Sequence, residues 1–212
     1  MSSLVHATLQ TPKESGVQRY RKPAGRLAAA LFLVALFFTE SPVSFPGALA
    51  METVGLFFVI FAALGRIWCA IYIAGRKNQE LCTDGPYSLC RNPLYGFSFL
   101  GVVGVALTAR LLPVAIMAGL VFWLYHHQVI LAEEEKLRCL FGERFDDYCS
   151  RVPRIWPRLH GFASRTAITL DPRLLVRAMT EVVWFLLALV LIEYVEHLRA
   201  ASFLPTLVLW RY

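Results

Sequence analysis

The stretch ALAMETVGLFFVIFAALGRIWCAIY, residues 48–72, decides the class of fold to which this chain belongs. Its 25 residues carry only two charges, Glu52 near the start and Arg66 toward the end. A helix needs about 20 predominantly apolar residues to cross the hydrocarbon core of a bilayer. Residues 48–72 are therefore predicted to form a membrane-spanning helix.

The composition of the whole chain agrees with a membrane protein. Of its 212 residues, 57% are hydrophobic and 17% are charged, whereas globular proteins have about 45–50% and about 25%. This composition excludes a disordered chain, and a soluble fold would leave too much apolar surface exposed to water. We expect an all-α integral membrane helical bundle that forms a single membrane domain over residues 1–212.

Four further apolar stretches, residues 26–39, 93–112, 113–131 and 178–194, bring the number of predicted transmembrane helices to five. Residues 26–39 are followed by no small-residue cleavage site with a soluble domain behind it, so they are predicted to be a span and not a removed signal peptide. Residues 203–210 are too short to span and are predicted to lie at the interface, where Trp210 and Tyr212 are favourable.

The positive charges predict the orientation. Seventeen of the 21 Lys and Arg residues lie before residue 27, in segment 75–91 or in segment 133–178. The positive-inside rule places these segments, and with them the N-terminus, in the cytoplasm. The net charge of +6 then favours an anionic membrane surface over nucleic acid as the partner. Apolar residues at helical spacing from Leu137 to Tyr148 predict a cytoplasmic amphipathic helix after the fourth span.

Two cytoplasmic features contain residues suited to chemistry. The first is GPYSLCRNPLYG, residues 85–96, whose prolines and glycines fix an irregular backbone at the start of the third span. The second is EEEK, residues 133–136, where three adjacent carboxylates follow the fourth span. From the residues alone, an ordinary interfacial loop and a solvated acidic turn remain open alternatives.

Other polar residues carry weaker signals. The five cysteines show no CxxC spacing, so they are predicted to be reduced thiols and no metal site is expected. His126 ends the fourth span, where it either lines the site or lies at the interface. Arg66 either reaches the membrane surface or pairs inside the bundle, near Glu52 or with a lipid headgroup. Gly101 and Gly104 are predicted to serve helix packing.

Residues 80–158 resemble the isoprenylcysteine carboxyl methyltransferase family and its relatives among phospholipid methyltransferases. That family shows G-P-Y, R-H-P-x-Y-x-G, E-E-x-x-L-x-x-x-F-G-x-x-Y-x-x-Y and V-P-x-x-x-P. The corresponding residues here are Gly85, Pro86, Tyr87, Arg91, Asn92, Pro93, Tyr95, Gly96, Glu133, Glu134, Leu137, Phe141, Gly142, Phe145, Tyr148, Val152, Pro153 and Pro157. Residues 1–79 and 159–212 flank this predicted methyltransferase core.

The resemblance implies S-adenosylmethionine as methyl donor, bound at the cytoplasmic membrane edge without a Rossmann domain or a metal. The residues that it assigns to the donor are Pro86, Tyr87, Asn92, Pro93, Tyr95, Glu133 and Glu134. The residues expected to take part in catalysis are Arg91, Glu134 and Arg154. Glu133 and Glu134 are suited to pair with the donor's ammonium group, or with an arginine that holds its carboxylate, and the tyrosines are suited to stack on the adenine or face the sulfonium.

The expected reaction is methyl transfer to a lipidic or membrane-associated acceptor, with carboxyl O-methylation of the isoprenylcysteine type favoured. N-methylation of a phospholipid amine, or methylation of a lipid phosphate or a small thiol, is the alternative chemistry. A transporter or assembly subunit without enzymatic activity is the alternative class. Asn92 stands where the family usually has His, and because Asn does not titrate, an acceptor that is already anionic fits better than a protonated amine. The sequence leaves the oligomeric state open.

Overall fold

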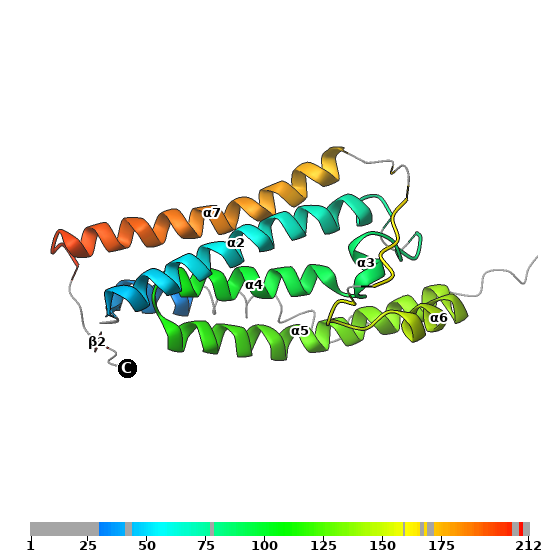
Figure 1. Cartoon of the computed structure of the whole chain (residues 1–212), viewed down its shortest axis with the longest axis horizontal. Helices are drawn as coiled ribbons and strands as arrows, with labels where there is room; N and C mark the ends of the chain where they lie inside the picture. Colours follow the sequence, from blue (N-terminus) through cyan, green and yellow to red (C-terminus); the bar gives the residue numbers. More distant parts are fainter. Residues whose placement is uncertain are drawn as a thin grey trace, which may run out of the picture.

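The computed structural model describes residues 30–40, 44–76, 79–158, 160–165, 168, 172–204 and 208–209. Its helices are α2 (Phe45–Ile73), α3 (Pro86–Leu89), α4 (Pro93–Thr108), α5 (Leu112–Phe141), α6 (Glu143–Arg151) and α7 (Pro172–Ala200), and residues 30–38 are also helical. Two short strands, β1 (Thr39–Glu40) and β2 (Val208–Leu209), pair in parallel, with Thr39 opposite Val208. The long helices run side by side, and α3 and α6 lie together at one end (Figure 1).

The predicted membrane bundle of helices is confirmed. In the described part of the chain, α2, α5 and α7 are each long and apolar enough to cross a bilayer. Helix α4 is also apolar but has only 16 residues, which corresponds to about 24 Å. The start of the first predicted span, the N-terminal tail and the interfacial residues Trp210 and Tyr212 lie outside the described residues.

Helix α4 is shorter than the predicted span 93–112. It ends at Thr108, and Arg110 then adopts a positive φ of 58°. Pro113 follows in the first turn of α5, where a proline is tolerated because its missing N–H would have no partner there. A tight turn therefore replaces the last residues of the predicted span and sends α5 back along α4.

Helix α5 is longer than the predicted span 113–131. It continues without a break through the three carboxylates and ends at Phe141. Gly142, with φ of 53°, separates α5 from the amphipathic helix α6. The predicted amphipathic segment is therefore divided into the end of α5 and a separate α6, because only glycine adopts this backbone conformation without strain. The carboxylates lie within a helix and not at its end.

Helices α2 and α4 approach closely where both carry glycine. A Cβ atom added at Gly104 would lie 2.7 Å from the carbonyl oxygen of Gly55. Helix α7 packs on the same pair, because a Cβ at Gly101 would lie 2.5 Å from the ring of Phe185. The packing role predicted for Gly101 and Gly104 is confirmed, and close contact between small residues is a common way for helices to associate in membranes.

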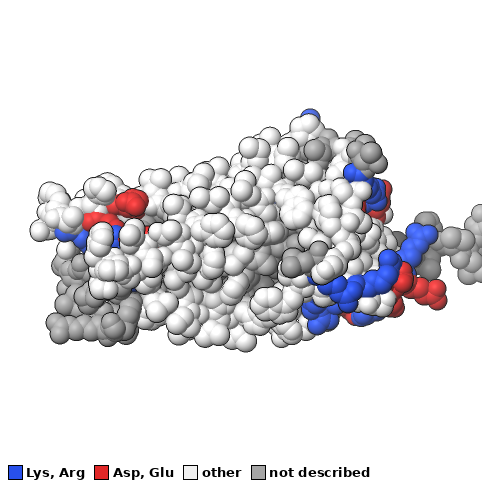
Figure 2. Space-filling model, in the orientation of Figure 1, with Lys and Arg blue, Asp and Glu red and all other residues white. Residues whose placement is uncertain are grey.

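The charged residues gather at the two ends of the bundle. Figure 2 shows arginines and lysines concentrated at the end that carries α3 and α6, which we call the basic end, and an uncharged surface between the ends on this face. At the other end, Arg110 pairs with Glu52 of α2 and lies 3.1 Å from Glu196 of α7. This distribution is the one expected of a protein that spans a bilayer. That the basic end faces the cytoplasm stays a prediction.

Arg66 pairs inside the bundle. Its guanidinium donates hydrogen bonds to Ser98 of α4 and to Glu181 of α7. The sequence left open that Arg66 pairs near Glu52. Glu52 instead pairs with Arg110 at the other end of the bundle. Glu181 lies nine residues inside α7, because this helix begins at Pro172, before the predicted span.

Candidate active site

Glu134 is the centre of a buried polar cluster at the basic end. It lies on α5, 5% of its surface is exposed, and both carboxylate oxygens have partners. Oε1 accepts a hydrogen bond from Nδ2 of Asn92 at 3.1 Å and lies 3.5 Å from Nε of Arg91. Oε2 accepts from Nε of Arg154 at 3.0 Å and lies 2.8 Å from its Nη2. Two segments that are 42 residues apart in the sequence thus meet at one carboxylate.

Backbone hydrogen bonds bring Arg154 to this cluster. The amide N–H groups of Arg91 and Asn92 donate to the carbonyl oxygens of Pro153 and Arg154, at 2.9 and 3.2 Å. The side chain of Asn92 also donates to the carbonyl of Arg154, at 3.2 Å. The segment that follows α6 is therefore held against the loop that precedes α4, which fixes the position of the Arg154 guanidinium.

Tyr95 and Glu133 form a second polar pair beside Glu134. The Tyr95 hydroxyl donates to Oε2 of Glu133 at 3.0 Å, which links the first turn of α4 to α5. The ring of His126 lies 5.4 Å from the ring of Tyr95 and stacks on Phe122 at 3.7 Å between centroids. His126 is therefore next to the candidate site, one of the two positions that the sequence left open.

Pro86 and Tyr87 are buried in α3. Tyr87 is 6% exposed and packs against Cys69 and Tyr72, and burial raises the pKa of its hydroxyl. Its backbone carbonyl accepts a hydrogen bond from Tyr148 of α6 at 2.7 Å. These residues hold α3 in place, whereas Arg91, Asn92, Tyr95, Glu133, Glu134 and Arg154 form the polar cluster. Pro93 is buried at the start of α4.

Sequence reasoning missed the contacts that hold the other side of the α3 loop. Asp84 is buried and is bound by Nη1 of Arg76 at 3.2 Å and by Nε of Arg165 at 2.9 Å. The amide of Gly85 donates to the carbonyl of Ala163 at 2.7 Å. The sequence signal for a constrained backbone in this loop was Gly85, because its φ of 60° favours a residue without a side chain.

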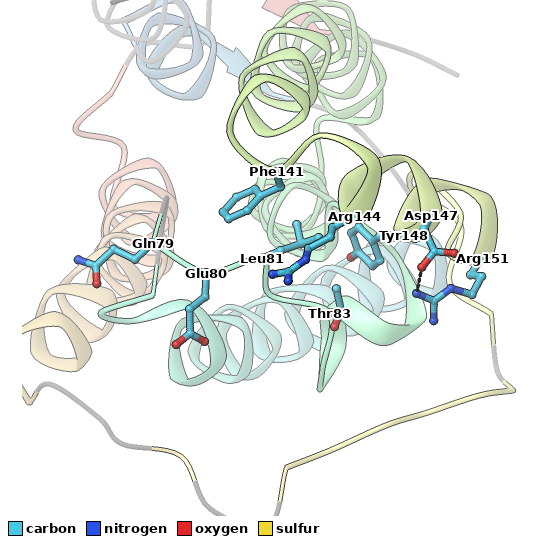
Figure 3. Close-up of a pocket in the computed structure, with 9 residues that line it drawn as sticks. All are labelled: Gln79, Glu80, Leu81, Thr83, Phe141, Arg144, Asp147, Tyr148 and Arg151. Carbon is cyan, nitrogen blue, oxygen red and sulfur yellow. Dashed lines mark hydrogen bonds and ion pairs between the residues drawn. The ribbon is translucent and has the colours of Figure 1, made fainter. Parts of the chain in front are cut away.

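An open cavity of about 430 Å³ lies at the basic end, between residues 79–83 and helices α5 and α6. Figure 3 shows Arg144 reaching from α6 toward residues 79–83, and the ion pair of Asp147 with Arg151 at the rim. None of the site residues expected from the sequence lines this cavity. Tyr148, which lines it, connects it to the α3 loop through its bond to Tyr87.

The residues of the polar cluster fit the charges of S-adenosylmethionine. Arg154 keeps 41% of its side chain exposed while it is oriented by Glu134, so its guanidinium is positioned to bind a carboxylate. Nε of Arg91 is buried and has no hydrogen-bond partner among the described residues. The Tyr95–Glu133 pair adds an aromatic ring and a carboxylate, which are favourable next to a cation. Glu134 accepts hydrogen bonds from Asn92 and Arg154, and it thereby orients the Arg154 guanidinium.

Comparison with known proteins places this chain in a family. The family model described as phospholipid methyltransferase matches residues 43–144. Protein-S-isoprenylcysteine O-methyltransferase of Schizosaccharomyces pombe is 30% identical over 83 residues, which are 38% of this chain and 35% of that protein. The chain belongs to the isoprenylcysteine and phospholipid methyltransferase family of membrane proteins. The recognition made from the two motifs is confirmed.

Two relatives match nearly the whole chain. The nickel-cobalt-cadmium resistance protein NccN of Alcaligenes xylosoxydans xylosoxydans is 38% identical over 94% of this chain and 93% of its own length. The cobalt-zinc-cadmium resistance protein CzcN of Cupriavidus metallidurans is 34% identical over 95% and 94%. No solved structure matches the chain significantly.

Proposed function

We propose that this family member transfers a methyl group from S-adenosylmethionine to a lipidic or membrane-associated acceptor at the basic end of the bundle. The observation that carries the proposal is the convergence of Arg91, Asn92 and Arg154 on the buried carboxylate of Glu134, with Tyr95 and Glu133 beside it. Family membership supports methyl transfer, and the charges of the cluster support this donor.

The short α4 supports an acceptor that lies in the membrane. Its 16 residues span about 24 Å, less than the hydrocarbon core of about 30 Å. Asn92 and Tyr95 at its start are therefore held near the boundary of the hydrocarbon. A membrane-bound acceptor reaches this level laterally, without leaving the bilayer.

Carboxyl O-methylation is the reaction that the cluster favours. The donor supplies a methyl group on a sulfonium; a lone pair of the acceptor oxygen forms the new bond to this carbon as the carbon–sulfur bond breaks, and the electrons of that bond stay on sulfur. A carboxylate loses no proton in this step, so it needs no general base, and Asn92 supplies none. The protein's part is to align the reactants and exclude water.

Donor binding tests the proposal. Calorimetry in detergent should detect binding of S-adenosylmethionine, and Glu134→Gln should weaken it at least tenfold because Arg91 and Arg154 lose their anchor. Glu135→Gln is the matched control, because Glu135 is the next residue on α5 but pairs with the exposed Arg138 at the surface. Tyr95→Ala removes the aromatic ring without touching the arginines and should also weaken binding. Unchanged affinity in both Glu134→Gln and Tyr95→Ala, in protein that elutes normally in gel filtration, would remove the site assignment.

The names of the two full-length relatives suggest a physiological setting. NccN and CzcN are named for resistance to nickel, cobalt, zinc and cadmium, and we infer that methylation by this protein contributes to tolerance of such ions. The inferred role is modification of a membrane component.

Complementation of a strain that lacks the protein tests whether tolerance of metal ions depends on methyl transfer. A strain that lacks the protein should regain growth in cobalt or cadmium with the wild type and with Glu135→Gln, but not with Glu134→Gln. Full rescue by Glu134→Gln would show that tolerance does not depend on methyl transfer.

A further inference from the structure

Arg66 places a positive charge inside the apolar part of the bundle. It lies seven residues before the end of α2 at Ile73, which is about 10 Å below that end. Its side chain is only 15% exposed. Charged residues at this depth are costly and in membrane proteins they usually serve function.

The two side chains of the ion pair between Arg66 and Glu181 differ in their exposure. The arginine is buried, but the side chain of Glu181 is 51% exposed on α7. Nε of Arg66 is buried and has no hydrogen-bond partner among the described residues. A carboxylate therefore occupies one side of a guanidinium that still has an unused donor, and this carboxylate lies on the exterior of the bundle, from which a membrane-bound molecule arrives.

The pair is close to the candidate active site along α4. Ser98, which accepts a hydrogen bond from Arg66, lies three residues after Tyr95. Residues three apart in a helix are neighbours on its surface, so Ser98 is one turn deeper in the membrane than Tyr95. Tyr95 in turn binds Glu133. Arg66 is thus linked to α4 one turn below Tyr95, which belongs to the polar cluster.

We propose that Arg66 binds the anionic oxygen group of the acceptor, and that Glu181 occupies this position until the acceptor displaces it. The inference rests on the proposed function and deepens it, because it assigns the acceptor an anionic group, a carboxylate or a phosphate. Glu181 neutralises Arg66 while no acceptor is bound, which avoids an unpaired charge in the bilayer.

Binding of simple amphiphiles tests this inference without methyl transfer. Radiolabelled dodecanoate, dodecyl phosphate and uncharged dodecanol are measured on the purified protein in lipid nanodiscs, relative to empty nanodiscs. Wild type should bind at least one anionic probe ten times more tightly than dodecanol, and whichever of the two it prefers identifies the acceptor group. Arg66→Gln should abolish this preference, and Arg66→Lys should retain part of it. Glu181→Gln should increase anionic binding about threefold, because the competing carboxylate is removed.

The opposite effects of the two substitutions separate a binding role from a structural one. If the pair only holds α2 to α7, Arg66→Gln and Glu181→Gln would change binding in the same direction, and that result would overturn the inference, as would unchanged anionic binding in Arg66→Gln. Arg110→Gln breaks an ion pair at the other end of the bundle and should leave probe binding unchanged. Donor affinity should remain at the wild-type value in all these variants, so the failure of this inference is distinguishable from failure of the donor site.

Discussion

Glu134 shows how one buried carboxylate organises a site by orienting the side chains around it. Asn92, Arg91 and Arg154 all bind it, and a buried charge with several charge-assisted partners is rigid. The three carboxylates of residues 133–135 consequently differ in role: Glu133 faces Tyr95, Glu134 faces the arginines, and Glu135 lies at the surface. Helical geometry explains this, because successive residues point in directions about 100° apart.

Two cysteines near the site predict a dependence of stability on pH. Burial raises the pKa of Cys82 and of Cys90 from the ordinary 9.0 to about 11, so the folded protein holds these protons more tightly than the unfolded chain. The stability from this source is complete below pH 9 and is lost as the pH rises toward 11. The thermal midpoint in detergent should fall over this range.

A double variant provides the control for this prediction. The thermal midpoint of the double variant Cys82→Ala, Cys90→Ala should fall less steeply between pH 9 and 11 than that of the wild type. The midpoint of Cys139→Ala should follow the wild type, because Cys139 is exposed. Identical slopes in all three proteins would contradict the assignment.

At the scale of elements, the close approach of α2 and α4 fixes the position of the site. Helix α4 carries Tyr95 at one end and Gly104 near the other, so its contact with α2 sets the height of Tyr95 opposite α5. This contact depends on the absence of side chains at Gly55 and Gly104. A change in the spacing of the two helices would therefore move the polar cluster.

Two glycines of the same helix test this contact. Gly104→Ala should destabilise the protein by about 1–3 kcal/mol, because the new methyl group overlaps the α2 backbone. Gly96→Ala should leave stability unchanged or raise it by up to about 1 kcal/mol, because the space around Gly96 is open. Thermal unfolding in detergent measures both, and equal midpoints would show that α2 and α4 are not packed as described.

At the scale of the whole molecule, the asymmetry of charge predicts how the protein sits in a membrane. The basic end carries α3, α6 and the candidate site, and the other end carries the Arg110 ion pairs. The positive-inside rule then predicts that the site faces the cytoplasm.

Cys139 reports this orientation directly. It is exposed near the end of α5, so in a variant whose other four cysteines are alanine it should react with a membrane-impermeant maleimide in inverted vesicles but not in intact cells. A cysteine introduced at Ala201, just after α7, should show the reverse pattern. Labelling of Cys139 in intact cells would contradict the predicted orientation.

The sequence was sufficient for the helical membrane fold and for the residues of the polar cluster, because both depend on local patterns. Hydrophobic length identified α2, α5 and α7, whereas the predicted third span is the shorter helix α4. Two motifs identified Asn92, Tyr95 and Glu134. Contacts between distant segments were not predictable: Arg66 and Glu181 are 115 residues apart, and no spacing rule joins them. The burial of Tyr87 was equally hidden, since a tyrosine in a loop looks the same whether it faces a ligand or the core.

The difference in length between α4 and its neighbours has a consequence for the choice of lipid. Helices α2, α5 and α7 have 29 or 30 residues, and α4 has 16. A thicker bilayer would tilt the long helices less and draw the start of α4 deeper below the headgroups, while a thinner one would bring it to the water boundary. The turnover of a membrane-bound acceptor should therefore pass through a maximum as the acyl chains of the host bilayer are lengthened.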